Sequence, residues 1–279
     1  MKRKKSQGFA PGARGFAAVT NSAAATASVV ASASSSATDI LSLSSSHCTE
    51  LHPNNSEFNG SRSIIGLFSG NRKVRILMHK LSNVDLAFLT YKQKLAFWIN
   101  VYNACIMHAF LEHGLPSTQE KLLALMNKAA LNVGGIVLNA LAIEHFILRH
   151  PCEPEYGPMD EKEMLLRHAY GLGYPEPNVT FALCRGTWSS PALRIYTADE
   201  VVNELEKAKV DYLEASVGIT NKKKISLPKL LQWHMKDFAD DVESLLEWIY
   251  SQLPRSGSLK RSIMECLNKE PKIPDCQNG

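Results

Sequence analysis

The longest apolar stretch of the chain, residues 94–113 (KLAFWINVYNACIMHAFLEH), predicts one long helix that contains two asparagines. On a 3.6-residue period most of its large apolar side chains share one stripe, and Asn100 and Asn103 fall on the adjoining face. A buried carboxamide without a hydrogen-bond partner costs about 1–3 kcal/mol. We therefore expect this helix to lie in the core, with both amides holding other segments of the chain.

The other periodic segments predict a mainly helical α+β fold, with a single domain over residues 73–267 and a few short strands. Gly134–Gly135 between two short apolar pieces predicts a tight hairpin, and residues 178–183 (NVTFAL) give the clearest prediction of a strand. A second hairpin is expected around Asn221–Lys222. The motifs S-x-x-E at 117–120 and T-x-x-E at 197–200 predict capping boxes that open helices. Further helices are predicted over residues 140–150, 161–170, from Pro228 toward Phe238, 242–253 and 258–267.

The two ends of the chain differ in composition from the predicted domain. Residues 1–46 hold eleven Ala and eleven Ser with few large apolar residues, so they cannot bury enough surface to offset the entropy of ordering. We expect a disordered N-terminus and linker over residues 1–72 and a disordered tail over 268–279. The basic start, MKRKK, and the absence of acids before Asp39 leave a nuclear signal or an organelle transit peptide open as alternatives.

Charge and cysteine usage exclude several classes of function. The net charge of +4 arises in the N-terminal segment, because residues 1–38 carry five basic residues and no acid, and the remainder carries 26 basic and 27 acidic residues. We therefore expect no nucleic-acid partner. The six scattered cysteines form no C-x-x-C pair, and no secretory signal is visible, which favours an intracellular protein, cytoplasmic or nuclear. The sequence contains no H-E-x-x-H motif and no phosphate-binding Gly-rich loop, and its longest apolar run is interrupted by polar residues, so we predict no metal, no cofactor and no membrane span.

One segment, residues 181–196 (FALCRGTWSSPALRIY), has the features of a nucleophile on a turn. Cys184 ends the predicted strand, Gly186 permits a sharp turn, and Ser190 brings a hydroxyl group. Arg185 and Arg194 would favour the thiolate form of the cysteine. The alternative interpretation is that Cys184 is a small core residue and that the serines cap a turn.

The adjacent residues Glu144 and His145 form a second candidate. An acid beside an imidazole can orient a general base, and His145 with Glu144 would then serve Cys184 in a cysteine-dependent hydrolase or thiol enzyme. The alternative is a half-buried structural histidine.

Several blocks of sequence, taken in order, resemble the plant form of the domain of unknown function 547 over about residues 87–238. The matching blocks are 94–103 (KLAFWINVYN), 128–135 (KAALNVGG), 143–149 (IEHFILR), 181–186 (FALCRG), 190–197 (SPALRIYT) and 227–231 (LPKLL). The resemblance implies an intracellular domain with no activity that can be transferred to this chain. Longer plant relatives also carry a leucine-zipper-like coiled coil, and no heptad region is present in this sequence.

Many relatives place a histidine before the F-A-L segment and cysteines in the loop after it, which resembles a cysteine-enzyme site. Here Thr180 stands where that histidine would be, Arg185 and Ser190 stand near the cysteine positions, and Cys184 is shifted by one residue. The resemblance therefore implies a site that is degenerate in this chain. Our first hypothesis is a non-catalytic interaction or regulatory domain with a protein partner, and the alternative is an enzyme that uses Cys184. The sequence fixes neither the partner nor the oligomeric state.

Overall fold

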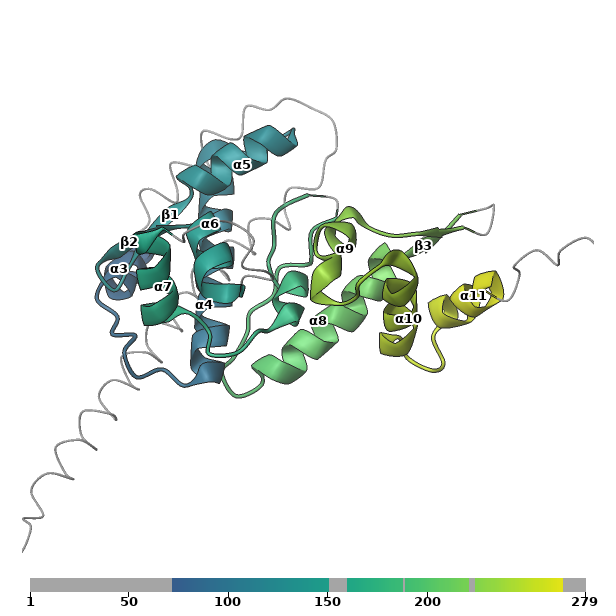
Figure 1. Cartoon of the computed structure of the whole chain (residues 1–279). Helices are drawn as coiled ribbons and strands as arrows, with labels where there is room; N and C mark the ends of the chain where they lie inside the picture. Colours follow the sequence, from purple (N-terminus) through teal and green to yellow (C-terminus); the bar gives the residue numbers. More distant parts are fainter. Residues whose placement is uncertain (1–71, 151–159, 188, 221–223, 268–279) are drawn as a thin grey trace, which may run out of the picture.

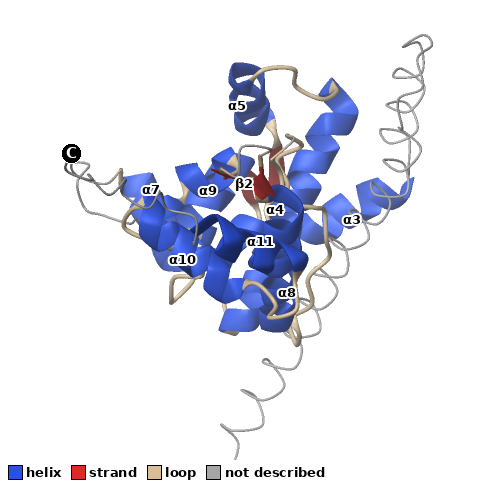
Figure 2. Cartoon of the chain, turned by 90° about the vertical axis from the view of Figure 1, so that its right-hand side faces the viewer, coloured by secondary structure: helices blue, strands red, loops and turns tan. Residues whose placement is uncertain are grey.

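A computed structural model describes residues 72–150, 160–187, 189–220 and 224–267 of the chain (Figure 1). The mainly helical α+β prediction is confirmed, because helices dominate and the strands of the described part form two two-stranded antiparallel sheets (Figure 2). The predictions for residues 1–71 and 268–279 lie outside the described residues. The first half of the fold contains α3 (Arg72–Ser82), α4 (Tyr91–His113), α5 (Gln119–Lys128), β1 (Ala130–Val133), β2 (Ile136–Asn139), α6 (Ala140–Ala142), η1 (Ile143–Leu148) and α7 (Glu161–Tyr170). The second half contains η2 (Pro177–Phe181), α8 (Val201–Ser216), β3 (Gly218–Ile219), β4 (Ile225–Ser226), α9 (Lys229–Trp233), η3 (Met235–Asp237), α10 (Val242–Gln252) and α11 (Ser258–Leu267).

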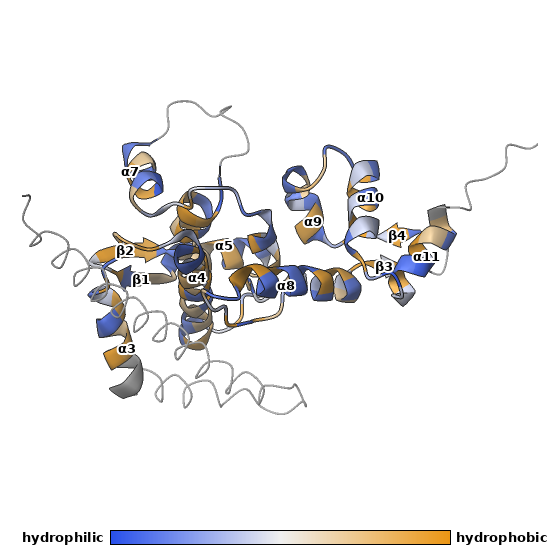
Figure 3. Cartoon of the chain, turned by 90° about the horizontal axis from the view of Figure 1, so that it is seen from below, coloured by the Kyte–Doolittle hydropathy of each residue, from blue (hydrophilic) through white to orange (hydrophobic). Residues whose placement is uncertain are grey.

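Helix α4 is the centre of the fold and is buried on every side from Leu95 to Met107. It begins three residues before the predicted start, because Thr90 and Gln93 form a capping box in which each side chain accepts the other's backbone N–H, at 3.4 and 3.0 Å. Figure 3 shows α4 coloured as hydrophobic along most of its length. A helix that is apolar all round has to be surrounded by other elements, which explains its central position.

The two asparagines of α4 are fully buried, and each binds the backbone of a distant loop at two points. Asn100 donates from Nδ2 to the Tyr196 carbonyl at 2.7 Å, and its Oδ1 accepts the Tyr196 N–H at 3.0 Å. Asn103 donates to the Ala182 carbonyl at 3.0 Å and accepts the Cys184 N–H at 2.9 Å. The loop between η2 and α8 has no strand neighbour in the described sheets, so these amides supply the hydrogen bonds that a sheet would otherwise provide.

Both predicted hairpins are present. β1 pairs with β2 across Gly134 and Gly135, whose φ angles of 60° and 86° are those of a type I′ turn that glycine adopts without strain. β3 pairs with β4 in the second hairpin.

The predicted strand over residues 178–183 is wrong, because this segment begins as the 3₁₀ helix η2. Pro177 at its first position has a fixed φ suited to a helical turn, and Glu176 accepts the Asn178 N–H at 3.2 Å.

Two helix starts also differ from the sequence patterns. Thr118, one residue after Ser117, caps α5 by accepting the Lys121 N–H at 3.3 Å. Thr197 does not cap α8, which begins at Val201. Instead its N–H donates to the Glu204 carboxylate at 2.8 Å, so the loop before the helix folds back on the first turn.

The predicted helix over residues 140–150 starts as the short α6 and widens into the π-helical turn η1. The backbone N–H of Arg149 donates to the carbonyl of Glu144, five residues earlier, at 3.0 Å. Such turns are rare and frequently occur at functional sites.

Two groups of buried apolar residues make up the core. The first cluster surrounds α4 and draws on α3, α5, β1, β2, η1 and α7. The second cluster joins Phe181 to α8, α9, α10 and α11, and includes rings of Phe181, Phe238 and Trp248 with neighbouring centroids 4.5–6.3 Å apart. None of the described helices is both long and apolar enough to span a membrane.

Candidate functional site

The side chain of Glu144 has no exposed surface and lies between two arginines. Arg149 donates from Nε to Glu144 Oε1 at 3.1 Å, and Arg185 donates to the same oxygen. The other oxygen, Oε2, accepts the hydroxyl of Tyr102 from α4 at 3.2 Å. Both carboxylate oxygens therefore have partners, as a buried charge requires.

Arg149 also binds residues in the C-terminal half of the fold. Its Nη1 donates to Thr180 Oγ1 at 3.1 Å and to Asp237 Oδ2 at 3.0 Å. The two acids, Glu144 and Asp237, balance the charge of the two arginines, Arg149 and Arg185. The four residues come from three separate segments of the chain. We call these four residues, together with His234, the charged cluster.

His234 sits against both guanidinium groups, with its Nε2 atom 3.5 Å from an Nη2 atom of Arg149 and of Arg185. A guanidinium can only donate, so Nε2 must be the acceptor. The ring proton is therefore assigned to Nδ1, which lies 3.7 Å from Asp237 Oδ2. The contacts of this histidine favour its neutral form.

The pKa values follow from these contacts. Burial alone would raise the pKa of Glu144, but Arg185 and Arg149 outweigh it and lower that pKa to about 2. Burial together with the same two arginines lowers the pKa of His234 to about 3. Burial of part of the ring and the nearby arginines lower the pKa of His145 as well, against the charge of Glu144. At neutral pH an ionised Glu144 therefore lies beside the neutral imidazoles of His234 and His145.

A pocket of about 210 Å³ opens next to this cluster. One wall comes from α5 and Leu141, the other from Trp233 on α9, and Glu144, His145, Arg185 and His234 line its polar end. The adjacent residues Glu144 and His145 therefore face different surroundings, with the acid in the interior and the imidazole exposed at the pocket.

Cys184 is buried. Its thiol accepts a hydrogen bond from Ser190 Oγ at 3.6 Å, and within the described ranges no hydrogen bond joins it to an imidazole. Neither arginine expected to favour its thiolate pairs with it, because Arg185 binds Glu144 and Arg194 binds Asp211 at 2.7 Å.

Gly186 and Ser190 shape the turn after Cys184. Gly186 has a φ of 67°, and a Cβ placed there would lie 2.5 Å from the ring of Phe110, so both the backbone and the space require glycine. Ser190 Oγ accepts the N–H groups of Arg185 and Gly186 at 2.7 and 3.3 Å. This turn aims the Arg185 side chain away from the thiol and toward Glu144.

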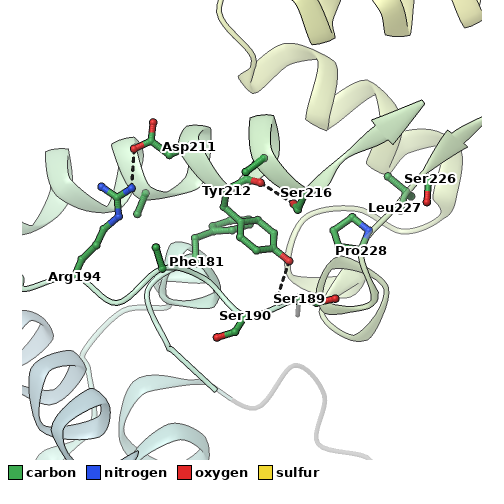
Figure 4. Close-up of a pocket in the computed structure, with 13 residues that line it drawn as sticks. Phe181, Ser189, Ser190, Arg194, Asp211, Tyr212, Ser216, Ser226, Leu227 and Pro228 are labelled. Atoms are coloured by element: carbon green, nitrogen blue, oxygen red, sulfur yellow. Dashed lines mark hydrogen bonds and ion pairs between the residues drawn. The ribbon is translucent and has the colours of Figure 1, made fainter. Parts of the chain in front are cut away.

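The far side of the same loop lines a second pocket, of about 490 Å³, along α8 (Figure 4). Figure 4 shows Ser190 beside Ser189, whose carbonyl accepts the hydroxyl of Tyr212 at 2.9 Å. Arg194 and Asp211 pair at one end of this pocket.

Sequence reasoning selected Glu144 but missed its partners Arg149, Arg185, His234 and Asp237 as one group. No spacing in the sequence links His234 to Glu144. The one local signal was that Glu144 and Arg149, which have opposite charges, stand five residues apart. Among the described residues, no three His, Cys, Asp or Glu side chains are grouped so that they could hold a metal ion.

Comparison with known proteins gives one match. No curated protein and no solved structure matches the chain significantly. A family model described as "Protein of unknown function, DUF547" matches residues 86–213, a segment that contains α4, Glu144, Arg149, Cys184 and Arg185. Residues 86–213 of the chain therefore belong to the DUF547 family.

Proposed function

We propose that residues 73–267 act as a non-catalytic interaction or regulatory domain. The observation that carries this proposal is the internal pairing of Glu144, the acid expected to assist catalysis. Both of its oxygens accept bonds from the two arginines and from Tyr102, so it has no free oxygen with which to orient His145.

The contacts of Cys184 do not favour the alternative, a cysteine-dependent hydrolase or thiol enzyme. A cysteine nucleophile is activated by a neighbouring base or by cationic groups. The buried thiol of Cys184 lies beside the Ser190 hydroxyl instead, and its backbone N–H is bound by Asn103.

The scattered cysteines and the absence of C-x-x-C support an intracellular location, cytoplasmic or nuclear, for this function. A protein partner remains our expectation for such a domain.

The experiment is alkylation of the native full-length chain by iodoacetamide between pH 6 and 9, with each cysteine followed by mass spectrometry. We expect Cys184 to be labelled far more slowly in the native protein than after unfolding. Cys105 is the internal control, because it is buried in α4 and burial raises its pKa to about 12. Fast native labelling of Cys184 at pH 6, where an ordinary thiol with a pKa of about 8.5 is protonated, would contradict the proposal.

A further inference from the structure

The pocket beside the charged cluster is open to solvent between two exposed apolar side chains. Leu123 on α5 is 53% exposed, and Trp233 on α9 is 52% exposed, although both line the same recess. Leu122 and Met126 continue the wall of α5 inward and are buried. Large apolar groups exposed at the mouth of a pocket that has a polar end are typical of a ligand site.

The polar end of this pocket offers donors. Glu144 has no exposed surface and no free oxygen, and His234 faces Arg149, Arg185 and Asp237 with its ring nitrogens. The groups left for a ligand are the partly exposed guanidinium of Arg185 and the ring of His145. His145 makes no hydrogen bond within the described part of the chain, and a guanidinium only donates.

The acids around the pocket do not present a free negative charge to a ligand. Glu144 is shared between Arg149 and Arg185, and Asp237 contacts Arg149 and lines a different pocket. Charge-assisted hydrogen bonds from a guanidinium to a carboxylate are about twice as strong as neutral ones. An anionic acceptor therefore suits Arg185 better than a neutral acceptor of the same shape.

We propose that this pocket binds a small organic carboxylate, with the carboxylate at Arg185 and His145 and the apolar body between Leu123 and Trp233. The volume of about 210 Å³ equals that of about seven water molecules in the liquid, so the pocket suits a small ligand. This inference rests on the proposed function, because it supplies the ligand that a regulatory domain would sense.

The test is calorimetric titration of the full chain with phenylacetate, and with phenylacetamide as the neutral analogue of the same shape. For a ligand of this size we expect a Kd of about 0.1–1 mM for phenylacetate, with the amide at least about tenfold weaker. Trp233→Ala and Leu123→Ala should each weaken phenylacetate binding about three- to tenfold. Leu165→Ala is the matched control, because Leu165 is another exposed leucine, on α7, that does not line this pocket.

Three results would overturn the proposal. These are no binding of phenylacetate up to about 10 mM, equal affinity for the acid and the amide, and a Kd that neither pocket variant changes. A tripeptide that ends in phenylalanine carries the same phenyl group and carboxylate at the C-terminus of a peptide. Titration with it tests whether the pocket binds a small free acid or the end of a peptide chain. Binding of this peptide without binding of phenylacetate would also overturn the proposal.

The same samples distinguish the failure of this inference from the failure of the proposed function. Phenylacetamide should be recovered unchanged after long incubation, as measured by NMR. Its hydrolysis would contradict the non-catalytic proposal whatever the affinity, whereas a lack of binding would leave that proposal standing.

Discussion

The first and second clusters of the core are specified by different means. In the first, α4 is apolar on all sides, and the position of the loop over it is fixed by Asn100 and Asn103, each of which binds the loop backbone at two points. In the second, α8, α9 and α10 each bury one apolar face, with the rings of Phe181 and Phe238 between them. The contrast is visible in Figure 3, where α8 is divided between hydrophilic and hydrophobic residues.

This difference shows which contacts restrict the fold to a single arrangement. Amphipathic faces pack in many nearly equivalent ways, whereas a buried amide or carboxylate tolerates only the arrangement that satisfies it. The charged cluster lies at the boundary, with Glu144 and Arg149 from the first region and His234 and Asp237 from the second.

The most severe change that separates the two regions is truncation after residue 213, where the family match ends. Removing α9 and α10 uncovers Phe181 and Tyr212 and removes His234 and Asp237 from the cluster. We expect the truncated chain to lose cooperative thermal unfolding, as measured by circular dichroism. Retention of a cooperative transition would show that the first region folds alone.

The second-largest effect is expected at Glu144. Glu144→Gln leaves two largely buried arginines without their shared carboxylate, and breaking a buried pair typically costs about 3–5 kcal/mol of unfolding free energy. Urea denaturation measures this cost. Asp211→Asn is the control, since it breaks the partly exposed pair with Arg194, for which we expect about 1 kcal/mol or less. Equal losses of unfolding free energy in the two variants would contradict the view that the charged cluster holds the two regions together.

The asparagines test the first region alone. Asn100→Leu and Asn103→Leu should each cost about 1–3 kcal/mol, because each leaves a backbone N–H and a carbonyl buried without partners. The readout is again urea denaturation. Asn203→Ala, on the exposed face of α8, should change stability by about 0.5 kcal/mol or less. Unchanged stability in both leucine variants would mean that packing alone positions the loop.

The dependence of stability on acid pH tests the charged cluster at the boundary between the regions. His234 has a pKa of about 3 when folded, so the unfolded chain, with an ordinary pKa near 6.5, takes up the proton first and stability falls as the pH drops from 6.5 toward 3. Glu144, lowered to about 2, adds to this loss below its usual pKa of 4.5. Thermal unfolding at pH 8 and pH 5 should show about 2 kcal/mol of lost stability from His234. His234→Gln should reduce this loss, and His113→Gln, at the exposed end of α4, should not.

The smallest effect is expected in the second region. Leu245→Met keeps the buried volume nearly constant, so it should cost less than about 1.5 kcal/mol. Urea denaturation measures this cost. A larger loss of unfolding free energy in Leu245→Met than in the asparagine variants would contradict the contrast between the two clusters.

Much of the helical fold was predictable because apolar periodicity reports burial directly. The long helix, both hairpins and the last two helices follow from spacing and from glycine or proline positions. Residues 178–183 were not predictable in the same way. Their apolar run suits a buried strand, but a strand needs a neighbour, and the 3₁₀ turn that forms instead depends on Pro177 and on distant contacts of Asn103.

The candidate site was predictable only in part. Glu144 and Gly186 were each selected from the residues next to them in the sequence, Glu144 with His145 and Gly186 with Cys184. The partners Arg185, His234 and Asp237 are brought to Glu144 by tertiary folding, and a single sequence contains no spacing that reports it.

The π-helical turn η1 holds one residue more than an ordinary helical turn would need to join Glu144 to Arg149. Deleting one residue between them would restore ordinary helical bonding and leave the arginine four residues after the acid, a spacing at which the two side chains still meet on one helix face. The extra residue therefore matters less for this pair than for the direction in which the chain leaves the helix, from which Arg149 also reaches Thr180 and Asp237.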